Sequence, residues 1–230
     1  AAYDDLIENN CRQIELFEEI ARLHYRELLR ANQALAQGEG VPIGWKRLRL
    51  EDICSQVRDQ ADPTKIDPDT PYLSMEHMQP RSISLGEWET AGKVNSSKLR
   101  FQRRDVLFGR IRPYFHKVGV AQVDGITSTD MIVARPNSEE LLPLVALTMS
   151  SDEFVAHAVA TSNGTKMPRA DWKVLKDWRV LLPRRSELID LSERVLPVLS
   201  LLEFLSSQNK LLRSARETLL PKLMSRELNV

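Results

Sequence analysis

The chain has 230 residues, 42% of them hydrophobic, which is enough for one sizeable core. Its 32 basic and 32 acidic side chains give a net charge of zero, which taken alone argues against nucleic-acid binding. Cys11 and Cys54 lie far apart and lack metal-ligand spacing, which argues against a disulfide framework or zinc site and favours a reducing compartment. Without a membrane-length apolar run or a leader pattern, we expect a cytoplasmic protein.

The first predicted element is a long helix over residues 1–37. Apolar residues recur there every seven positions, with further seam residues between them, as an a/d seam requires. The seam residues are Ile7, Asn10, Ile14, Phe17, Ala21, His24 and Leu28. The chain begins almost inside this helix, so we expect a processed chain or half of a longer one.

A globular block over residues 41–185 follows a linker rich in Gly and Pro at 38–44. Short strands are predicted at 45–50, 71–75, 105–111, 117–123 and 127–134. A helical stretch at 141–160, a polar loop at 161–169 and a strand at 178–182 complete the block. These elements predict a mixed α/β domain.

The last element is a second long helix over residues 186–224. Its apolar stripe comprises Leu188, Leu191, Val195, Val198, Leu202, Leu205, Leu212 and Leu219. Each helix should be about 45–50 Å long, and because the block returns the chain to its start, the two should pair antiparallel. Asn10 and Asn209 both fall on the seam, where buried amides fix register. Pro197 should kink or split the second helix.

The predicted fold class is therefore α+β, with one domain flanked by an antiparallel coiled coil. The alternative is a pair of amphipathic helices packed on an ordinary core.

Positive charge is concentrated within the middle block. Residues 1–40 carry four basic and eight acidic side chains, whereas residues 41–185 carry 22 and 18. One basic cluster comprises Arg100, Arg103, Arg104, Arg110, Arg112 and Lys117. The other comprises Lys166, Arg169, Lys173, Lys176, Arg179, Arg184 and Arg185. Such patches suit a phosphate backbone, and solvated surface residues are the alternative.

Motifs for covalent chemistry are missing from the sequence. A GxxxxGK[ST] phosphate loop and a GxGxxG dinucleotide motif are both absent. Residues 112–115 (RPYF) faintly echo the tetrad of adenine methyltransferases but lack its first polar residue and second proline. Asp62, Asp67 and Asp69 could be arranged as a nuclease metal site, but the neighbouring prolines favour a turn-rich loop.

Several segments together resemble the specificity subunits of type I restriction–modification systems. Residues 105–121 (DVLFGRIRPYFHKVGVA), followed by 125–129 and 132–136, resemble their target recognition domain. Residues 71–76, 161–172 (TSNGTKMPRADW) and 181–183 occur in the same order. Residues 5–14 resemble the family's central helix and 219–228 its closing segment, although Arg226 stands where the family often has glycine. The resemblance covers nearly the whole chain.

The resemblance implies a non-catalytic subunit that recognises one half of a split double-stranded DNA target. Family members usually carry two such domains, so this chain is expected to be a C-terminal half or a short subunit that forms a homodimer through its helices. The helical pair would then act as a ruler between half-sites. Methyltransferase subunits would be direct partners, and restriction and motor subunits indirect ones. S-adenosylmethionine, Mg²⁺ and ATP are expected on those partners only.

Candidate DNA-binding residues follow from side-chain chemistry. Arginine and lysine suit phosphates or guanine edges, aromatic rings suit sugar or thymine methyl groups, and a small polar loop suits backbone approach to phosphate. The candidates are Arg81, Lys93, Arg110, Arg112, Tyr114, Lys117, Thr165, Lys166 and Arg169. Residues 79–98, including Ser84, Asn95 and Ser96, are an alternative location for base specificity.

Two other classes of protein stay open at this point. A stand-alone nuclease or methyltransferase would require turnover by the chain alone. A coiled-coil scaffold without DNA reading would show negligible, salt-insensitive DNA affinity.

Overall fold

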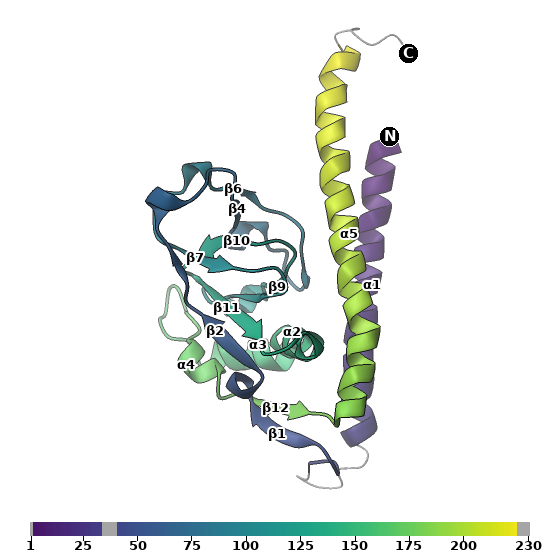
Figure 1. Ribbon diagram of the computed structural model, residues 1–230, viewed down its shortest axis with the longest axis vertical. Helices are drawn as coiled ribbons and strands as arrows, with labels where there is room; N and C mark the ends of the chain where they lie inside the picture. Colours follow the sequence, from purple (N-terminus) through teal and green to yellow (C-terminus); the bar gives the residue numbers. More distant parts are fainter. Residues whose placement is uncertain (1, 34–40, 225–230) are drawn as a thin grey trace.

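Two long helices stand side by side, and a mixed α/β domain lies against one side of them (Figure 1). The computed structural model describes residues 2–33 and 41–224. Helix α1 (Ala2–Gln33) has 32 residues and α5 (Arg185–Met224) has 40. Both helices extend beyond the domain at the end where α1 begins (Figure 1).

The helices pair antiparallel, as the sequence predicts. Near the start of α1, Asp4 accepts a hydrogen bond of 2.7 Å from Arg216 near the end of α5. Asn10 and Asn209 are both buried, and Asn10 Nδ2 donates to Asn209 Oδ1 at 2.9 Å. Because buried amides are satisfied only in one alignment, this pair favours a single register.

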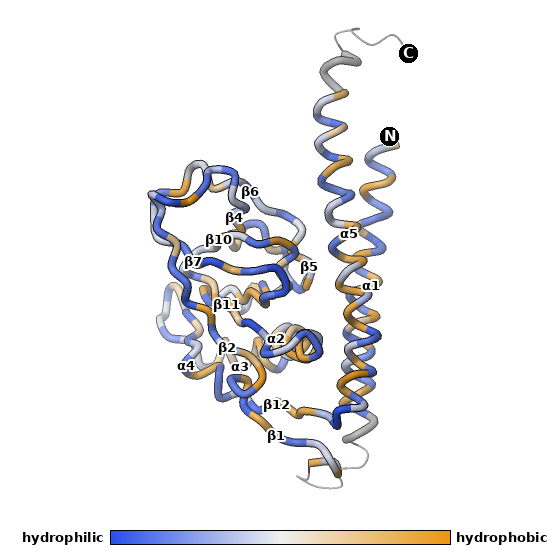
Figure 2. Tube along the Cα trace, viewed as in Figure 1, coloured by the Kyte–Doolittle hydropathy of each residue, from blue (hydrophilic) through white to orange (hydrophobic). Residues whose placement is uncertain are grey.

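The predicted seam residues are withdrawn from solvent to different degrees. Figure 2 shows apolar residues recurring along both helices. Besides the asparagine pair, the buried ones are Ala21, Leu188, Leu191, Val195, Val198, Leu202 and Leu205. The half-buried ones are Ile7, Ile14, Phe17, His24, Leu28, Leu212 and Leu219.

The predicted split of the second helix at Pro197 is wrong, because α5 continues through this residue. Pro197 is exposed. A proline removes one backbone hydrogen bond, and on an exposed side water can solvate the freed carbonyl.

Removing one member of the asparagine pair should lower the stability of the protein. We expect Asn10→Ala to lower the free energy of unfolding by about 1–3 kcal/mol, because the buried Asn209 amide loses its partner. The double variant Asn10→Leu, Asn209→Leu should recover much of that loss by removing both polar groups. Urea unfolding of the three proteins checks this, and equal stabilities would contradict it.

Short strands build two five-stranded sheets and a two-stranded ribbon in the domain. The first sheet has the order β3-β7-β10-β4-β6, with strands Gln60–Ala61, Lys98–Phe101, Gly125–Ser128, Pro71–Leu73 and Glu89–Thr90. The second has the order β2-β11-β8-β9-β5, with strands Cys54–Val57, Met131–Pro136, Val106–Gly109, Val118–Ala121 and Ser84–Leu85. In the ribbon, β1 (Lys46–Arg49) pairs antiparallel with β12 (Arg179–Leu182).

Two predicted elements are each divided in the structure. The predicted strand at 127–134 covers the end of β10 and most of β11, with a turn between them. The predicted helical stretch at 141–160 is α2 (Leu142–Met149) followed by α3 (Asp152–Ala160). Ser151 causes this break, because its Oγ accepts a hydrogen bond from Phe154 N and caps α3.

The main core lies between the second sheet, α2 and the helical pair. All residues of α2 are buried, so this helix joins the domain to the long helices. Beside it, Phe154 is fully buried and contacts the rings of Phe108 and Trp178 edge to face. Short α4 (Trp172–Leu175) buries Trp172 and Leu175 in the same core.

Candidate nucleic-acid interface

A sharp corner between β8 and β9 carries the first group of predicted DNA-binding residues. It contains the single turn η5 (Pro113–Phe115), flanked by Arg112 (φ 47°) and His116 (φ 52°) in the left-handed region. Such angles are uncommon for residues other than glycine and often occur at functional sites. The corner leaves Tyr114 53% and Phe115 41% exposed, with ring centroids 4.9 Å apart.

The polar loop 161–169 carries the second group. Asn163 and Arg169 close it through two backbone hydrogen bonds of 3.0 and 2.8 Å. Gly164 has φ 98°, a conformation that a side chain would strain. Thr165 and Lys166 are exposed at the tip.

The structure brings these two groups together. Arg112 N donates to Pro168 O at 2.8 Å, and Ala170 N donates to Arg110 O at 2.9 Å. The loop before α4 lies on the side of the domain away from α5 (Figure 1). We call this region the loop surface; it comprises Arg110, Arg112, Tyr114, Phe115, Thr165, Lys166 and Arg169.

The loop surface is cationic, and two of its arginine side chains have N–H groups without a hydrogen-bond acceptor among the described residues. Arg110 and Arg112 are half-buried, and the Nε–H of each has no acceptor within the described part of the chain. Arg169 Nε lies 3.6 Å from an oxygen of Asp130, an exposed ion pair that solvent weakens. Both Nε–H groups are themselves buried, so a DNA acceptor would reach them only after the side chains move.

Other predicted DNA-binding residues lie elsewhere. Lys117 Nζ donates to Met75 O at 2.6 Å inside the domain. Arg81 forms an exposed pair with Asp152 at 2.7 Å, next to α1 rather than on the loop surface. The Lys93 side chain lies outside the described residues. From the alternative stretch, Ser84 contacts α5, whereas Asn95 and Ser96 are exposed.

Many residues of the two basic clusters are paired with carboxylates. Arg103 forms two hydrogen bonds with Glu203 of α5, at 2.9 and 2.7 Å, and these raise the pKa of Arg103. A hydrogen bond to Glu51 raises the pKa of Lys176, and hydrogen bonding to Glu187 raises that of Arg184. Because these cations are already paired with carboxylates, the summed charge of each cluster overstates the charge that is free to contact DNA.

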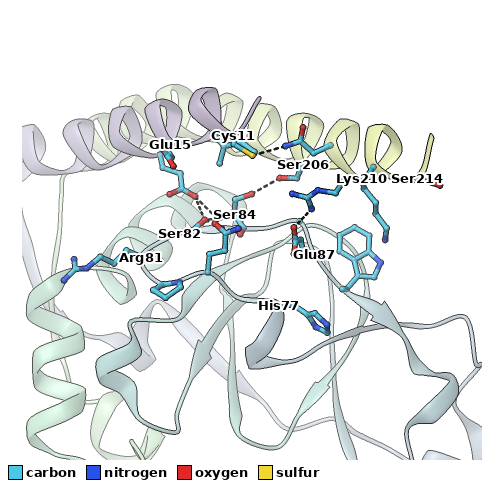
Figure 3. Close-up of a pocket in the computed structure, with 18 of the residues that line it drawn as sticks. Cys11, Glu15, His77, Arg81, Ser82, Ser84, Glu87, Ser206, Lys210 and Ser214 are labelled. Atoms are coloured by element: carbon cyan, nitrogen blue, oxygen red, sulfur yellow. Dashed lines mark hydrogen bonds and ion pairs between the residues drawn. The ribbon is translucent and has the colours of Figure 1, made fainter. Parts of the chain in front are cut away.

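A cleft of about 640 Å³ lies between the helical pair and the domain (Figure 3). On one side it is lined by α1 and α5, and on the other by residues 77–88. Lys210 Nζ lies 3.8 Å from the ring centroid of Trp88, and Arg213 pairs with Glu87 at the same wall. Its lining carries both signs of charge, unlike the loop surface.

One buried carboxylate of this region was not predicted. Glu18 of α1 is 4% exposed and accepts hydrogen bonds from Ser82, Ile83 and Ser84. In the sequence, Glu18 resembles any solvated helix glutamate, and its partners are more than 60 residues away. The heptad pattern therefore contains no signal that would have identified it.

His116 should make stability depend on pH. Its Nε2–H donates to Ser150 O at 2.8 Å, and burial lowers the pKa of the imidazole below 6.5. Because protons then bind preferentially to the unfolded chain, stability is full above about pH 6.5 and falls as pH drops through the lowered pKa. We expect His116→Asn, which tolerates positive φ, to lose less stability than wild type between about pH 7.5 and 5.5 in urea unfolding. Equal losses of stability in wild type and His116→Asn over this pH range would contradict this.

Within residues 2–33 and 41–224, no cluster of three or more His, Cys, Asp or Glu side chains is placed to hold a metal ion. No helix in these ranges is long and apolar enough to span a membrane.

The fold defines a mixed α/β domain mounted on an antiparallel helical pair. An S subunit of a type I restriction–modification system from M. genitalium shares it with a TM-score of 0.62 and 12% identity, over 96% of this chain and 57% of that one. A chain from a structure on the assembly of a type I R-M system shares it with a TM-score of 0.55 and 23% identity, over 83% and 50%. No family model matches the chain.

Sequence similarity leads to the same family. The specificity subunit of the type I restriction enzyme EcoDI from Escherichia coli is 26% identical over 160 residues, which are 67% of this chain and 35% of that subunit. The chain is thus similar in sequence to one type I restriction specificity subunit and in fold to two further type I restriction–modification chains. It spans about a third of the length of this curated relative and about half of the two structural ones.

Proposed function

We propose that this chain recognises one half of a split DNA target as a non-catalytic specificity subunit. The observation that carries this proposal is the convergence of the corner 110–116 and the loop 161–169 on one cationic, partly aromatic surface. Phosphate contacts by basic side chains supply affinity, and contacts with base edges supply specificity.

Each part of the loop surface has a suited partner on DNA. Arg110 and Arg112 donate to phosphates or to O6 and N7 of guanine. Tyr114 and Phe115 pack against sugars or thymine methyl groups. Gly164 and Thr165 let a phosphate approach the backbone, and Lys166 supplies a cation.

The helical pair offers a separate surface for methyltransferase subunits. Leu16, Ile20 and Leu23 of α1 are 65, 39 and 45% exposed, and on a helix these positions lie away from the side that carries Glu18 and the domain. On α5, Leu201, Phe204 and Leu211 are 42, 62 and 71% exposed. Apolar side chains grouped on exposed helix faces are typical of protein–protein interfaces.

Methylation mapping tests the reading function. The chain is co-expressed with its methyltransferase subunit, and methylated adenines in host DNA are mapped for wild type, Arg110→Ala, Arg112→Ala and Lys166→Ala. A split motif whose methylation weakens in these variants supports the proposal. A palindromic motif would indicate self-pairing and an asymmetric one a second recognition domain. A stable complex that methylates no defined motif would overturn DNA reading.

An acidic residue among the exposed apolar side chains of α5 should block docking of the methyltransferase subunit. We expect Phe204→Asp to leave the thermal midpoint of the isolated chain within about 2 °C of wild type, because the residue is exposed. Copurification with the methyltransferase subunit should fall at least about tenfold, because a charge would be buried in an apolar interface. Val159→Asp, at an exposed position of α3 in the domain, serves as the control. Equal copurification of both variants would refute this docking surface.

A further inference from the structure

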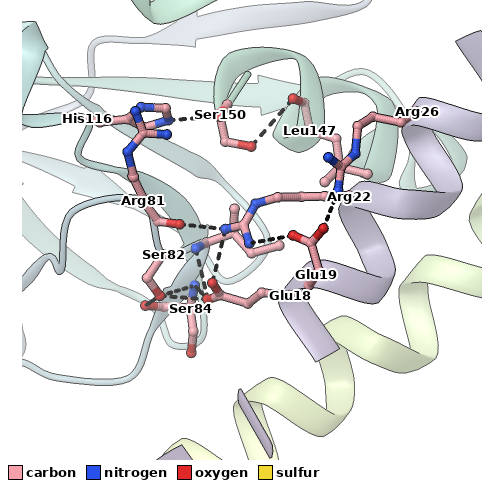
Figure 4. A network of polar contacts seen from close by, with 11 residues as sticks. Glu18, Glu19, Arg22, Arg26, Arg81, Ser82, Ser84, His116, Leu147 and Ser150 are labelled. Carbon is pink, nitrogen blue, oxygen red and sulfur yellow. Dashed lines mark hydrogen bonds and ion pairs between the residues drawn. The ribbon is translucent and has the colours of Figure 1, made fainter. Parts of the chain in front are cut away.

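Glu18 of α1 contacts the domain through a compact group of hydrogen bonds (Figure 4). One oxygen of Glu18 accepts from Ser82 Oγ at 2.6 Å and from the backbone N–H groups of Ile83 and Ser84 at 3.0 Å each. The other accepts from Arg22 Nη2 at 3.0 Å. A buried charge is tolerated when it is this fully paired, so the geometry of these contacts is strongly constrained.

The same contacts continue toward the loop surface. Arg22 donates to the carbonyl oxygen of Arg81, and Arg81 N donates to His116 O at 2.8 Å. His116 ends the corner that displays Tyr114. Arg81 and His116 both have positive φ, a strained backbone that persists only where surrounding contacts fix it. A continuous path of hydrogen bonds therefore joins α1 to the corner.

Strand β5 also lies directly on α5. Ser84 Oγ contacts Ser206 Oγ at 2.9 Å. A Cβ added to Gly86 would lie 2.3 Å from Ser206 Cβ, so only glycine permits this approach. The segment 82–86 is consequently fixed by both helices at once, by Glu18 on one and by close packing on the other.

We propose that Glu18 and Arg22 are positioning residues that set the orientation of the loop surface on the helical pair and thereby restrict the spacing between DNA half-sites. This inference rests on the proposed function. One added base pair moves a half-site by about 3.4 Å and rotates it by about 34°. A domain held rigidly cannot follow such a shift, whereas a loosened domain can.

Distance measurements test the orientation without any DNA. Spin labels are attached at Leu16→Cys on α1 and Lys173→Cys on α4, both exposed, in a Cys11→Ser background. Cys54 should stay unlabelled, because it is buried and burial raises the pKa of its thiol to about 12. We expect Glu18→Ala to broaden the distance distribution about twofold, because the domain gains alternative orientations.

Two comparison variants make the measurement specific. Glu18→Gln keeps one oxygen for the three donors of residues 82–84 but loses the acceptor for Arg22, so its width should lie between those of wild type and Glu18→Ala. Arg103→Ala removes an exposed ion pair between domain and α5 and should also stay narrow. If Glu18→Ala unfolds, Ser82→Ala removes one donor and should broaden the distribution to a smaller extent. Unchanged widths in both Glu18→Ala and Ser82→Ala would overturn the proposal.

Spacing selectivity is the functional readout. The assembled methyltransferase is assayed on duplexes that carry its mapped motif with the spacer lengthened or shortened by one base pair. We expect Glu18→Ala to reduce the preference for the natural spacer about tenfold, Glu18→Gln to reduce it less, and Arg103→Ala to retain it. Broadening without loss of selectivity would overturn the spacing role. A wild-type complex without sequence preference would instead refute the proposed function, and the distance measurement would still test the contact.

Discussion

Replacing Arg110, Arg112 and Lys166 together by alanine is expected to weaken DNA binding by at least about 100-fold. Losing about 1 kcal/mol at each of three cationic contacts gives this factor. The measurement is fluorescence anisotropy of the methyltransferase complex on a duplex that carries its mapped motif. The dependence of log affinity on log salt should also become shallower by about 0.9 for each lost phosphate contact.

A control variant must show whether the loss of DNA affinity comes from lost contacts at the loop surface or only from lower net charge. Lys46, Arg47 and Lys65 are exposed outside the loop surface, and their triple alanine variant removes the same three positive charges. We expect that control to stay within about threefold of wild type at physiological salt, since long-range charge is largely screened. If both triple variants lose equal affinity, the loop surface is not the site of contact.

The sequence predicted the helical pair well because one physical pattern controls it. A seven-residue repeat specifies which side of each helix is buried, so Asn10 and Asn209 could be assigned to the same seam before their hydrogen bond was known. The split predicted at Pro197 was wrong because the penalty for proline depends on whether water reaches the freed carbonyl, and the repeat does not report exposure.

The domain was predicted less completely. Strands of two residues, such as β3, β5 and β6, are too short to show an alternating pattern. The predicted loop-surface residues came from local sequence features, but their convergence depends on backbone hydrogen bonds between residues 112 and 168. Arg103 was counted as part of a free basic cluster, but it is paired with Glu203. The local charge count could not show this, because Glu203 is 100 positions away in the sequence.

The largest loss of stability is expected for Phe154→Ala. Phe154 is 0% exposed, and its ring centroid lies 5.7 Å from that of Phe108 and 5.6 Å from that of Trp178, both edge to face. Removing a buried phenyl ring costs about 3–5 kcal/mol through lost burial and the cavity left behind. Thermal unfolding should therefore begin at least about 6 °C lower than in wild type.

Phe204→Ala is the matched control, because the same atoms are removed from a residue that is 62% exposed. It should change stability by less than about 0.5 kcal/mol. Phe154 lies in the first turn of α3, and His116 bonds to Ser150 just before this helix. Loss of the ring should therefore also loosen the corner that carries Arg112. DNA affinity of Phe154→Ala should then decline with temperature before global unfolding is complete. If affinity instead persists up to the unfolding transition, the corner is held independently of this core.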